Sequence, residues 1–172
     1  MTHLLDTARL RLRTLTLDDA AFYLELVTSA AFIDAIGDRG IRTLAAARRA
    51  IVDGPMAMQR SLGHSLCLVE LKHDGTPIGM CGLIKRDTLP SVDIGYAILA
   101  RYSGQGYATE AAAAVLAHAA SLGIKRVLAI TSPGNAGSNA VLRRIGMRFE
   151  KIVHLTQGDP GTLLYAYDCP AD

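Results

Sequence analysis

The segment Arg101-Tyr-Ser-Gly-Gln-Gly-Tyr-Ala-Thr-Glu110 carries the strongest structural signal in this chain. An apolar stretch, Val92 to Ala100, comes directly before it and is typical of a strand, and an alanine-rich helical pattern starts directly after it. The first N–H groups of a helix have no partner within the helix, and the helix dipole makes that end positive. Glycines let a ligand approach the backbone closely. The sequence therefore predicts an anion site that binds a phosphate-bearing ligand.

Glycine loops occur in several kinds of nucleotide site, and this loop lacks the marks of two of them. Gly104 and Gly106 are not followed by a third glycine, nor by an acidic residue at the end of the next strand, which argues against a dinucleotide fingerprint. The loop also lacks the Gly-Lys-Ser/Thr of a P-loop, which argues against ATP chemistry. For the glycines taken alone, a structural turn without a ligand is the alternative.

The rest of the sequence predicts further strands and helices around this segment. Arg9 to Thr14 alternates as a strand, and Thr16 with Asp19 forms a capping-box pattern that opens a helix to about Ser29. Residues 30–42 show no clear period and are predicted to be a loop. The other predicted elements are helices at 44–52, 106–122 and 135–145 and strands at 65–72, 78–85, 92–99, 126–131, 147–156 and 162–168. This order predicts an α/β domain on one mixed sheet.

Length and composition are those of an ordinary globular protein. The 172 residues allow one domain with a sizeable core, and half of them are apolar, so we predict a single domain over residues 1–172. The net charge of +2 and the lack of a basic run argue against a nucleic-acid partner. The N-terminus resembles neither a signal peptide nor a membrane span. We therefore expect a cytoplasmic protein without a membrane partner.

Cysteines and histidines do not stand at the spacing of a metal site. Cys67, Cys81 and Cys169 are odd in number and lack zinc-site spacing, so buried thiols in a reducing compartment are expected. The five histidines stand neither at ligand spacing nor beside a cysteine. We therefore expect no metal cofactor.

Two motifs give the chain a resemblance to a known family. Arg/Gln-x-x-Gly-x-Gly/Ala is present as Arg101-Tyr-Ser-Gly104-Gln-Gly106. Asn-x-x-Ser, followed by Arg or Lys and then Gly-aromatic, appears as Asn135-Ala-Gly-Ser138 and Arg144-Ile-Gly146-Met147, with a methionine in the aromatic position. On these residues the sequence resembles the GNAT N-acetyltransferase superfamily, and most of all the branch that acetylates N-terminal amines of ribosomal proteins. The resemblance implies an α/β (α+β) fold of order β-α-α-β-β-β-α-β-α-β-β, with a mixed, mostly antiparallel sheet of six to seven strands and helices on both faces.

The resemblance also implies acetyl-CoA as the acetyl donor. The open edge of the strand at 92–99 would pair with the pantetheine arm near Ile98 and Leu99, in a gap before the parallel strand at 127–130. Arg101 and Arg144 would balance the phosphate on the adenosine side, or they are solvated surface charges. The N–H groups that would hold the pyrophosphate are those of Gln105, Gly106, Tyr107, Ala108 and Thr109, in the loop that includes Gly104.

Acetyl transfer to an amine needs a neutral amine and a proton for the leaving thiolate. The candidate bases are Asp93, placed like a carboxylate that the branch often carries before Ile-Gly-Tyr, and Glu70, a lone carboxylate in an apolar strand. A solvent-facing carboxylate and a cross-sheet pair are the respective alternatives. Many superfamily members use a tyrosine seven residues after the asparagine as the acid, but here that residue is Leu142. Ser138 matches the serine proposed for this role in the ribosomal branch and also fits a helix start. Asn135 would cap that helix and bind the pantetheine arm.

Three tyrosines near these motifs, Tyr96, Tyr102 and Tyr107, are further candidates for the acid, although tyrosines in strands and loops commonly serve packing.

The prediction is an acetyl-CoA-dependent N-acetyltransferase that acts on a primary amine, either a protein N-terminus or a small molecule. The alternative is a non-catalytic acyl-CoA-binding or sensing module on the same fold. Because dimers are frequent in the superfamily, a homodimer through the last strands is compatible with this prediction.

Overall fold

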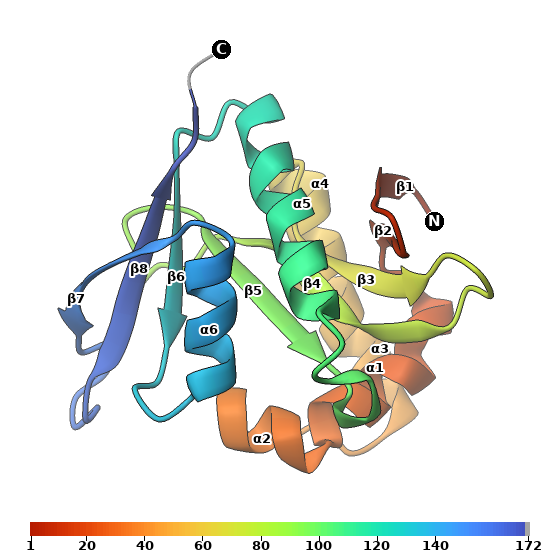
Figure 1. Cartoon of the computed structure of the whole chain (residues 1–172). Coiled ribbons are helices and arrows are strands. Elements are labelled where there is room, and N and C mark those ends of the chain that lie inside the picture. Colours follow the sequence, from red (N-terminus) through yellow and green to blue (C-terminus); the bar gives the residue numbers. More distant parts are fainter. Residues whose placement is uncertain (171–172) are drawn as a thin grey trace.

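The computed structural model describes residues 1–170, and its strands form one mixed sheet (Figure 1). The strands are β1 (His3–Asp6), β2 (Leu10–Thr14), β3 (Leu66–Leu71), β4 (Pro77–Ile84), β5 (Asp93–Ile98), β6 (Arg126–Thr131), β7 (Arg148–Val153) and β8 (Thr162–Asp168). Their order in the sheet is β1-β2-β3-β4-β5-β6-β8-β7. Neighbours are antiparallel except β5 and β6, which are parallel. The predicted mostly antiparallel mixed sheet is confirmed, with eight strands instead of six to seven.

Helices cover both faces of this sheet, as predicted (Figure 1). On one face α5 (Tyr107–Ser121) and α6 (Ala136–Arg144) close a core that includes Val69, Ile94 and Tyr165. On the other face α1 (Ala20–Thr28), α2 (Ala30–Ile36) and α3 (Leu44–Ile51) close a core that includes Leu68 and Met80. The remaining helical elements are η1 (Leu17–Asp19), η2 (Val52–Met56), α4 (Ala57–Leu62) and η3 (Ala100–Tyr102).

The alanine face of α5 sets the position of the glycine loop. Ala111, Ala112 and Ala119 are fully buried, and α5 lies against β4 and β5. Small side chains allow a helix to approach a sheet closely, and each buried alanine pays no side-chain entropy. The start of α5 is therefore held beside the C-terminal end of β5, where the glycine loop connects them.

Three parts of the chain differ from the sequence prediction. The helix predicted at 44–52 continues through η2 and α4 as far as Leu62. The stretch at 30–42, predicted to be a loop, contains helix α2, whose Ser29 side chain accepts a hydrogen bond from Phe32 N–H at 3.3 Å. The helix was missed because its seven residues are almost all apolar and show no amphipathic period. Strand β1 was not predicted, since it has only four residues and pairs with β2 through an irregular register. The other predicted strands and helices are present, with ends that differ by a few residues.

Candidate active site

The glycine loop presents a row of free backbone donors. Gly104 and Gly106 have φ of 74° and 81°, a left-handed conformation that favours glycine. Gly106 is the N-cap of α5, and Glu110 N–H makes the first helical bond back to its carbonyl at 3.0 Å. Within residues 1–170, no protein acceptor binds the N–H groups of residues 105–109. These are the five groups that the resemblance described above assigns to a pyrophosphate, and five adjacent donors at a positive helix end suit such a ligand.

The turn between β1 and β2 braces this loop. Arg9 Nε donates to Glu110 Oε2 at 2.7 Å, and its Nη1 donates to the Gln105 carbonyl at 3.0 Å. Thr7 Oγ1 donates to Glu110 Oε1 at 2.5 Å, and the Arg9 guanidinium lies 4.4 Å from the centre of the Tyr107 ring. Partial burial raises the pKa of Glu110, but hydrogen bonds from Thr7 and Arg9 outweigh it and hold the pKa below its usual value. Sequence reasoning missed Arg9 and Glu110 as partners because 101 residues separate them.

A gap between β5 and β6 opens next to the loop. The two strands form a single parallel pair, Asp93 with Leu128, and they diverge beyond it (Figure 1). Leu99 N–H donates to the Ile78 carbonyl at 2.9 Å, and the Leu99 carbonyl accepts from Tyr102 N–H at 2.9 Å. Because alternate residues of a strand direct their main-chain groups to opposite sides, those of Ile98 face the gap. The edge that the resemblance assigns to a pantetheine arm is thus open at Ile98, whereas both main-chain groups of Leu99 are engaged.

The start of α6 brings the predicted Asn135 and Ser138 together with Tyr96. Asn135 Oδ1 accepts from Ser138 N–H at 3.0 Å and so caps the helix, as predicted. Across the gap, the Tyr96 hydroxyl on β5 lies 2.9 Å from Ser138 Oγ and donates to the Ser138 carbonyl at 3.2 Å. Burial raises the pKa of Tyr96 to about 12, although the bond with Ser138 partly opposes this rise. Tyr96 therefore keeps its proton near neutral pH.

The predicted base Asp93 is buried and paired. Asp93 is 0% exposed to solvent, and both of its carboxylate oxygens accept hydrogen bonds from Arg86 Nε at 3.1 Å. Burial raises the pKa of Asp93, and the charge and hydrogen bonds of Arg86 oppose that rise. Asp93 belongs to the single residue pair that joins β5 to β6, so it lies at the closed end of the gap. Contact of this carboxylate with an amine would require the pair with Arg86 to open.

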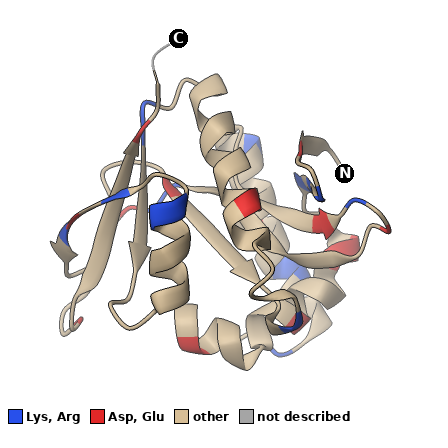
Figure 2. Ribbon diagram, in the orientation of Figure 1, with Lys and Arg blue, Asp and Glu red and all other residues tan. Residues whose placement is uncertain are grey.

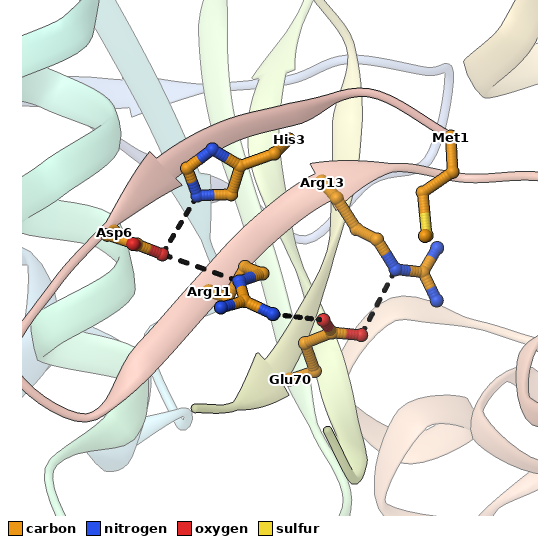
Figure 3. A pocket seen from close by; sticks show the side chains of 6 residues that line it. All are labelled: Met1, His3, Asp6, Arg11, Arg13 and Glu70. Carbon is orange, nitrogen blue, oxygen red and sulfur yellow. Dashed lines mark hydrogen bonds and ion pairs between the residues drawn. The ribbon is translucent and has the colours of Figure 1, made fainter. Parts of the chain in front are cut away.

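The other predicted base, Glu70, lies on β3, with β4 between it and β5. At about 4.8 Å per strand, its backbone is roughly 10 Å from the gap. Its carboxylate binds Arg13 Nε at 3.0 Å and lies 3.8 Å from Arg11 Nη1. Glu70 lines a cavity of about 270 Å³ at the edge of the sheet, together with Met1, His3, Asp6, Arg11 and Arg13 (Figure 3). This geometry matches the cross-sheet pair that was its alternative and does not support Glu70 as the base.

The two arginines expected near the phosphates have different surroundings. Arg101 Nη1 donates to Glu25 Oε1 on α1 at 2.5 Å, so its charge is shared with a carboxylate. Arg144 is exposed and is the last residue of α6. The nine residues of that helix put it about 13 Å from Asn135. The structure therefore separates Arg144 from the polar groups at the start of α6.

Charges of both signs are spread along the chain (Figure 2). Within residues 1–170, no three His, Cys, Asp or Glu side chains gather in a way that could hold a metal ion. In the same part of the chain, no helix combines the length and apolar character needed to cross a membrane. Cys67 and Cys81 are buried free thiols, and burial raises the pKa of Cys67 to about 12, which makes it a poor nucleophile.

A glycine loop at a helix start, a splayed pair of parallel strands and a mixed sheet are thus present together. Residues 9–148 match the family model for the acetyltransferase (GNAT) domain. The chain belongs to the GNAT acetyltransferase family. The match includes the glycine loop, both diverging strands and α6, and ends at the first residue of β7.

Relatives of this GNAT protein share parts or all of its length. The uncharacterized protein YkkB of Bacillus subtilis (strain 168) is 33% identical over 98 residues, which cover 55% of this chain and 57% of YkkB. The match thus spans little more than half of that curated relative. An acetyltransferase structure from Agrobacterium tumefaciens str. C58 is 28% identical, with a TM-score of 0.81 over 97% of this chain and 94% of that one. RimL, a ribosomal L7/L12 alpha-N-protein acetyltransferase solved with coenzyme A, has a TM-score of 0.85 over 99% of this chain and 100% of its own, at 20% identity that shows the fold alone.

This GNAT protein has no tyrosine at the position where the superfamily pattern places one. Leu142 occupies that position on α6 and is 1% exposed, packed in the core between α5, α6 and the sheet. A leucine side chain has no proton to donate. An acid for acetyl transfer would therefore have to be a residue other than Leu142.

Proposed function

We propose that this GNAT protein transfers an acetyl group from acetyl-CoA to a primary amine, carried by a protein N-terminus or by a small molecule. The observation that carries the proposal is the row of five N–H groups at 105–109, free of acceptors among the described residues and adjacent to the open edge of β5. A diphosphate needs several fixed donors, and an arm that carries amides needs a strand edge. The chain offers both within a few residues.

Each part of the site has a role in this proposal. Bound acetyl-CoA would supply the acetyl group as an activated thioester. The N–H groups of residues 105–109 would hold its diphosphate, and the main chain at Ile98 would bind the arm and meet the developing oxyanion. Asn135 would add a hydrogen bond to the arm, and Ser138 would protonate the leaving sulfur. Asp93 would accept a proton from a charged amine before the attack, when its pair with Arg86 opens.

The state of the two carboxylates favours an acceptor whose amine is already partly neutral. Asp93 and Glu70 are both paired with arginines, so the site offers little basic help. At pH 7.5 an α-amino group with a pKa of about 8 is roughly one-quarter neutral, whereas a lysine with a pKa of about 10.4 is only about 0.1% neutral. A protein N-terminus or another amine of low pKa therefore suits this site better than a lysine side chain.

The second candidate is a non-catalytic module that binds or senses acyl-CoA. The observation that favours it is the buried Leu142 in place of the family's tyrosine. The two functions are separated by a thermal-shift measurement with acetyl-CoA and an assay of thiol release against a panel of amines and peptide N-termini. Turnover with low-pKa amines supports the transferase. A thermal shift without turnover on any acceptor supports the sensor, and a folded protein without a thermal shift contradicts acetyl-CoA binding.

A further inference from the structure

Within residues 1–170, a hydrogen bond between the side chains of Tyr96 and Ser138 links β5 to α6 across the gap. The Tyr96 hydroxyl lies 2.9 Å from Ser138 Oγ and 3.2 Å from the Ser138 carbonyl oxygen. Tyr96 is three residues beyond Asp93, where β5 last pairs with β6, so it stands on the diverging part of the strand. The pair therefore lies where the acetyl group would have to react.

The Ser138 side of this pair is rigidly held. Asn135 Oδ1 accepts from Ser138 N–H, and Asn139 Nδ2 donates to the Asn135 carbonyl at 2.8 Å. Asn139 Oδ1 in turn accepts from the hydroxyl of Tyr165 at 2.7 Å, and Tyr165 is 1% exposed. These bonds fix the first turn of α6 to the sheet. The freedom that remains at Ser138 is the rotation of its hydroxyl, and Tyr96 is the protein group that contacts this hydroxyl.

We propose that Tyr96 is the positioning residue for Ser138 in acetyl transfer, a role that rests on the proposed function. Either hydroxyl can donate across the 2.9 Å between Tyr96 and Ser138 Oγ. In the reacting state that we propose, the single phenol proton points at Ser138 Oγ, which leaves the serine proton free to point at the leaving sulfur. When the carbon–sulfur bond breaks, its electron pair stays on sulfur, and Ser138 Oγ gives its proton to that sulfur. Ser138 then takes the proton that the acetylated nitrogen loses, so each turnover returns both hydroxyls to their starting state. Between these two proton transfers, the hydrogen bond from the phenol stabilises the negative charge on Ser138 Oγ.

The chemistry of the two hydroxyls supports this division of roles. Burial raises the pKa of Tyr96 to about 12, which keeps the phenol protonated and acting as a donor. A serine hydroxyl can rotate to serve as donor or acceptor, so its direction depends on its partner. In this protein a tyrosine from β5 and a serine from α6 together supply the polar groups that Leu142 does not.

Kinetic variants test the pair. Tyr96→Phe keeps the ring and removes the hydroxyl, and we expect kcat to fall by about 10-fold or more while KM for acetyl-CoA changes by less than about two-fold. The double variant with Ser138→Ala should be no slower than Ser138→Ala alone, because the two groups act as a unit. Tyr167→Phe is the matched control, since it makes the same change in a half-buried tyrosine of β8 and should leave kcat unchanged. Wild-type kcat in Tyr96→Phe, or losses that multiply in the double variant, would overturn the proposal.

A second measurement does not depend on turnover. With tyrosines labelled with carbon-13 at Cζ, the Tyr96 resonance is identified by its disappearance in Tyr96→Phe. We expect this resonance to move in Ser138→Ala and on addition of acetyl-CoA, while the Tyr167 resonance moves in neither case. A Tyr96 resonance that does not respond to Ser138→Ala would overturn the pairing. If acetyl-CoA binds but no amine is acetylated, the transferase function fails, and the resonance still decides whether Tyr96 holds Ser138.

Discussion

Replacing Arg86 by methionine should destabilise the protein, and the loss should grow as the pH rises. The change removes the guanidinium that donates to both oxygens of Asp93 at 3.1 Å and keeps an apolar stem of similar length. Asp93 has 0% exposure, so water cannot replace the lost partner without a structural opening. Burial of a charged carboxylate without a partner is strongly unfavourable in free energy, so the group binds a proton and becomes neutral.

The cost of this protonation sets the magnitude. An aspartate with an ordinary pKa of about 3.9 needs about 1.36 kcal/mol for each pH unit above that value to be protonated, or about 4 kcal/mol at pH 7 and about 1.5 kcal/mol at pH 5. These values are upper limits, because the native protein already bears part of the desolvation cost. We expect Arg86→Met to lower the free energy of unfolding by about 2–4 kcal/mol at pH 7 and by less than about 1.5 kcal/mol at pH 5.

The direction of the pH dependence follows from the raised pKa of Asp93. Burial raises this pKa above its unfolded value, and Arg86 only partly opposes the rise. The contribution of Asp93 to stability is therefore fully present below about pH 4 and is lost as the pH rises through its folded-state pKa. Without Arg86 that pKa rises further, so the range of pH over which stability falls becomes wider.

Urea denaturation of wild type, Arg86→Met and Arg86→Met/Asp93→Asn at pH 5 and pH 7 measures these differences. The double variant has no buried charge left and should recover most of the stability at pH 7. Arg148→Met is the control, because its exposed pair with Asp168 should contribute little at either pH. Equal losses for Arg86→Met at the two pH values, or a double variant no more stable than the single one, would refute the reasoning. The double variant also shows whether kcat depends on the Asp93 carboxylate.

Three further outcomes are expected. Gly106→Glu should abolish acetyl-CoA binding in calorimetry while the protein stays folded, because it places a carboxylate among the free N–H groups. Gly158→Glu is the control, since Gly158 has a similar φ of 84° in a distant exposed turn, and this variant should bind acetyl-CoA normally. Equal binding by both variants argues against the loop assignment. Arg9→Met should weaken acetyl-CoA binding several-fold, since it removes the guanidinium that joins Glu110 to the Gln105 carbonyl and so frees the loop. Unchanged affinity would contradict a bracing role. Tyr165→Phe should cost about 1–2 kcal/mol in urea denaturation, because it leaves a buried amide oxygen of α6 without a donor, and a loss below about 0.5 kcal/mol would contradict that contact.

Local sequence signals predicted most of the fold. The alternation at Leu10–Thr14, the apolar run at Arg126–Thr131 and the helical period after Gly106 depend on neighbours a few residues apart, so they can be recognised without a structure. Helix α2 and strand β1 lacked such a period because they are short. Their places are set by packing, as shown by Phe32 in the core between the helices and the sheet.

Some features of the candidate site likewise follow from local sequence, and others follow only from tertiary contacts. The sequence alone determined the glycine loop, the cap at Asn135 and the absence of a tyrosine at Leu142, because these are properties of single positions and short spacings. Only the tertiary structure decided which charges and hydroxyls meet: Arg9 with Glu110, and Tyr96 with Ser138, over separations of 101 and 42 residues. Such pairings depend on strand register and on the contact of a helix with the sheet. Composition and periodicity do not contain that information, since many distant partners of the right charge are equally compatible with one sequence pattern.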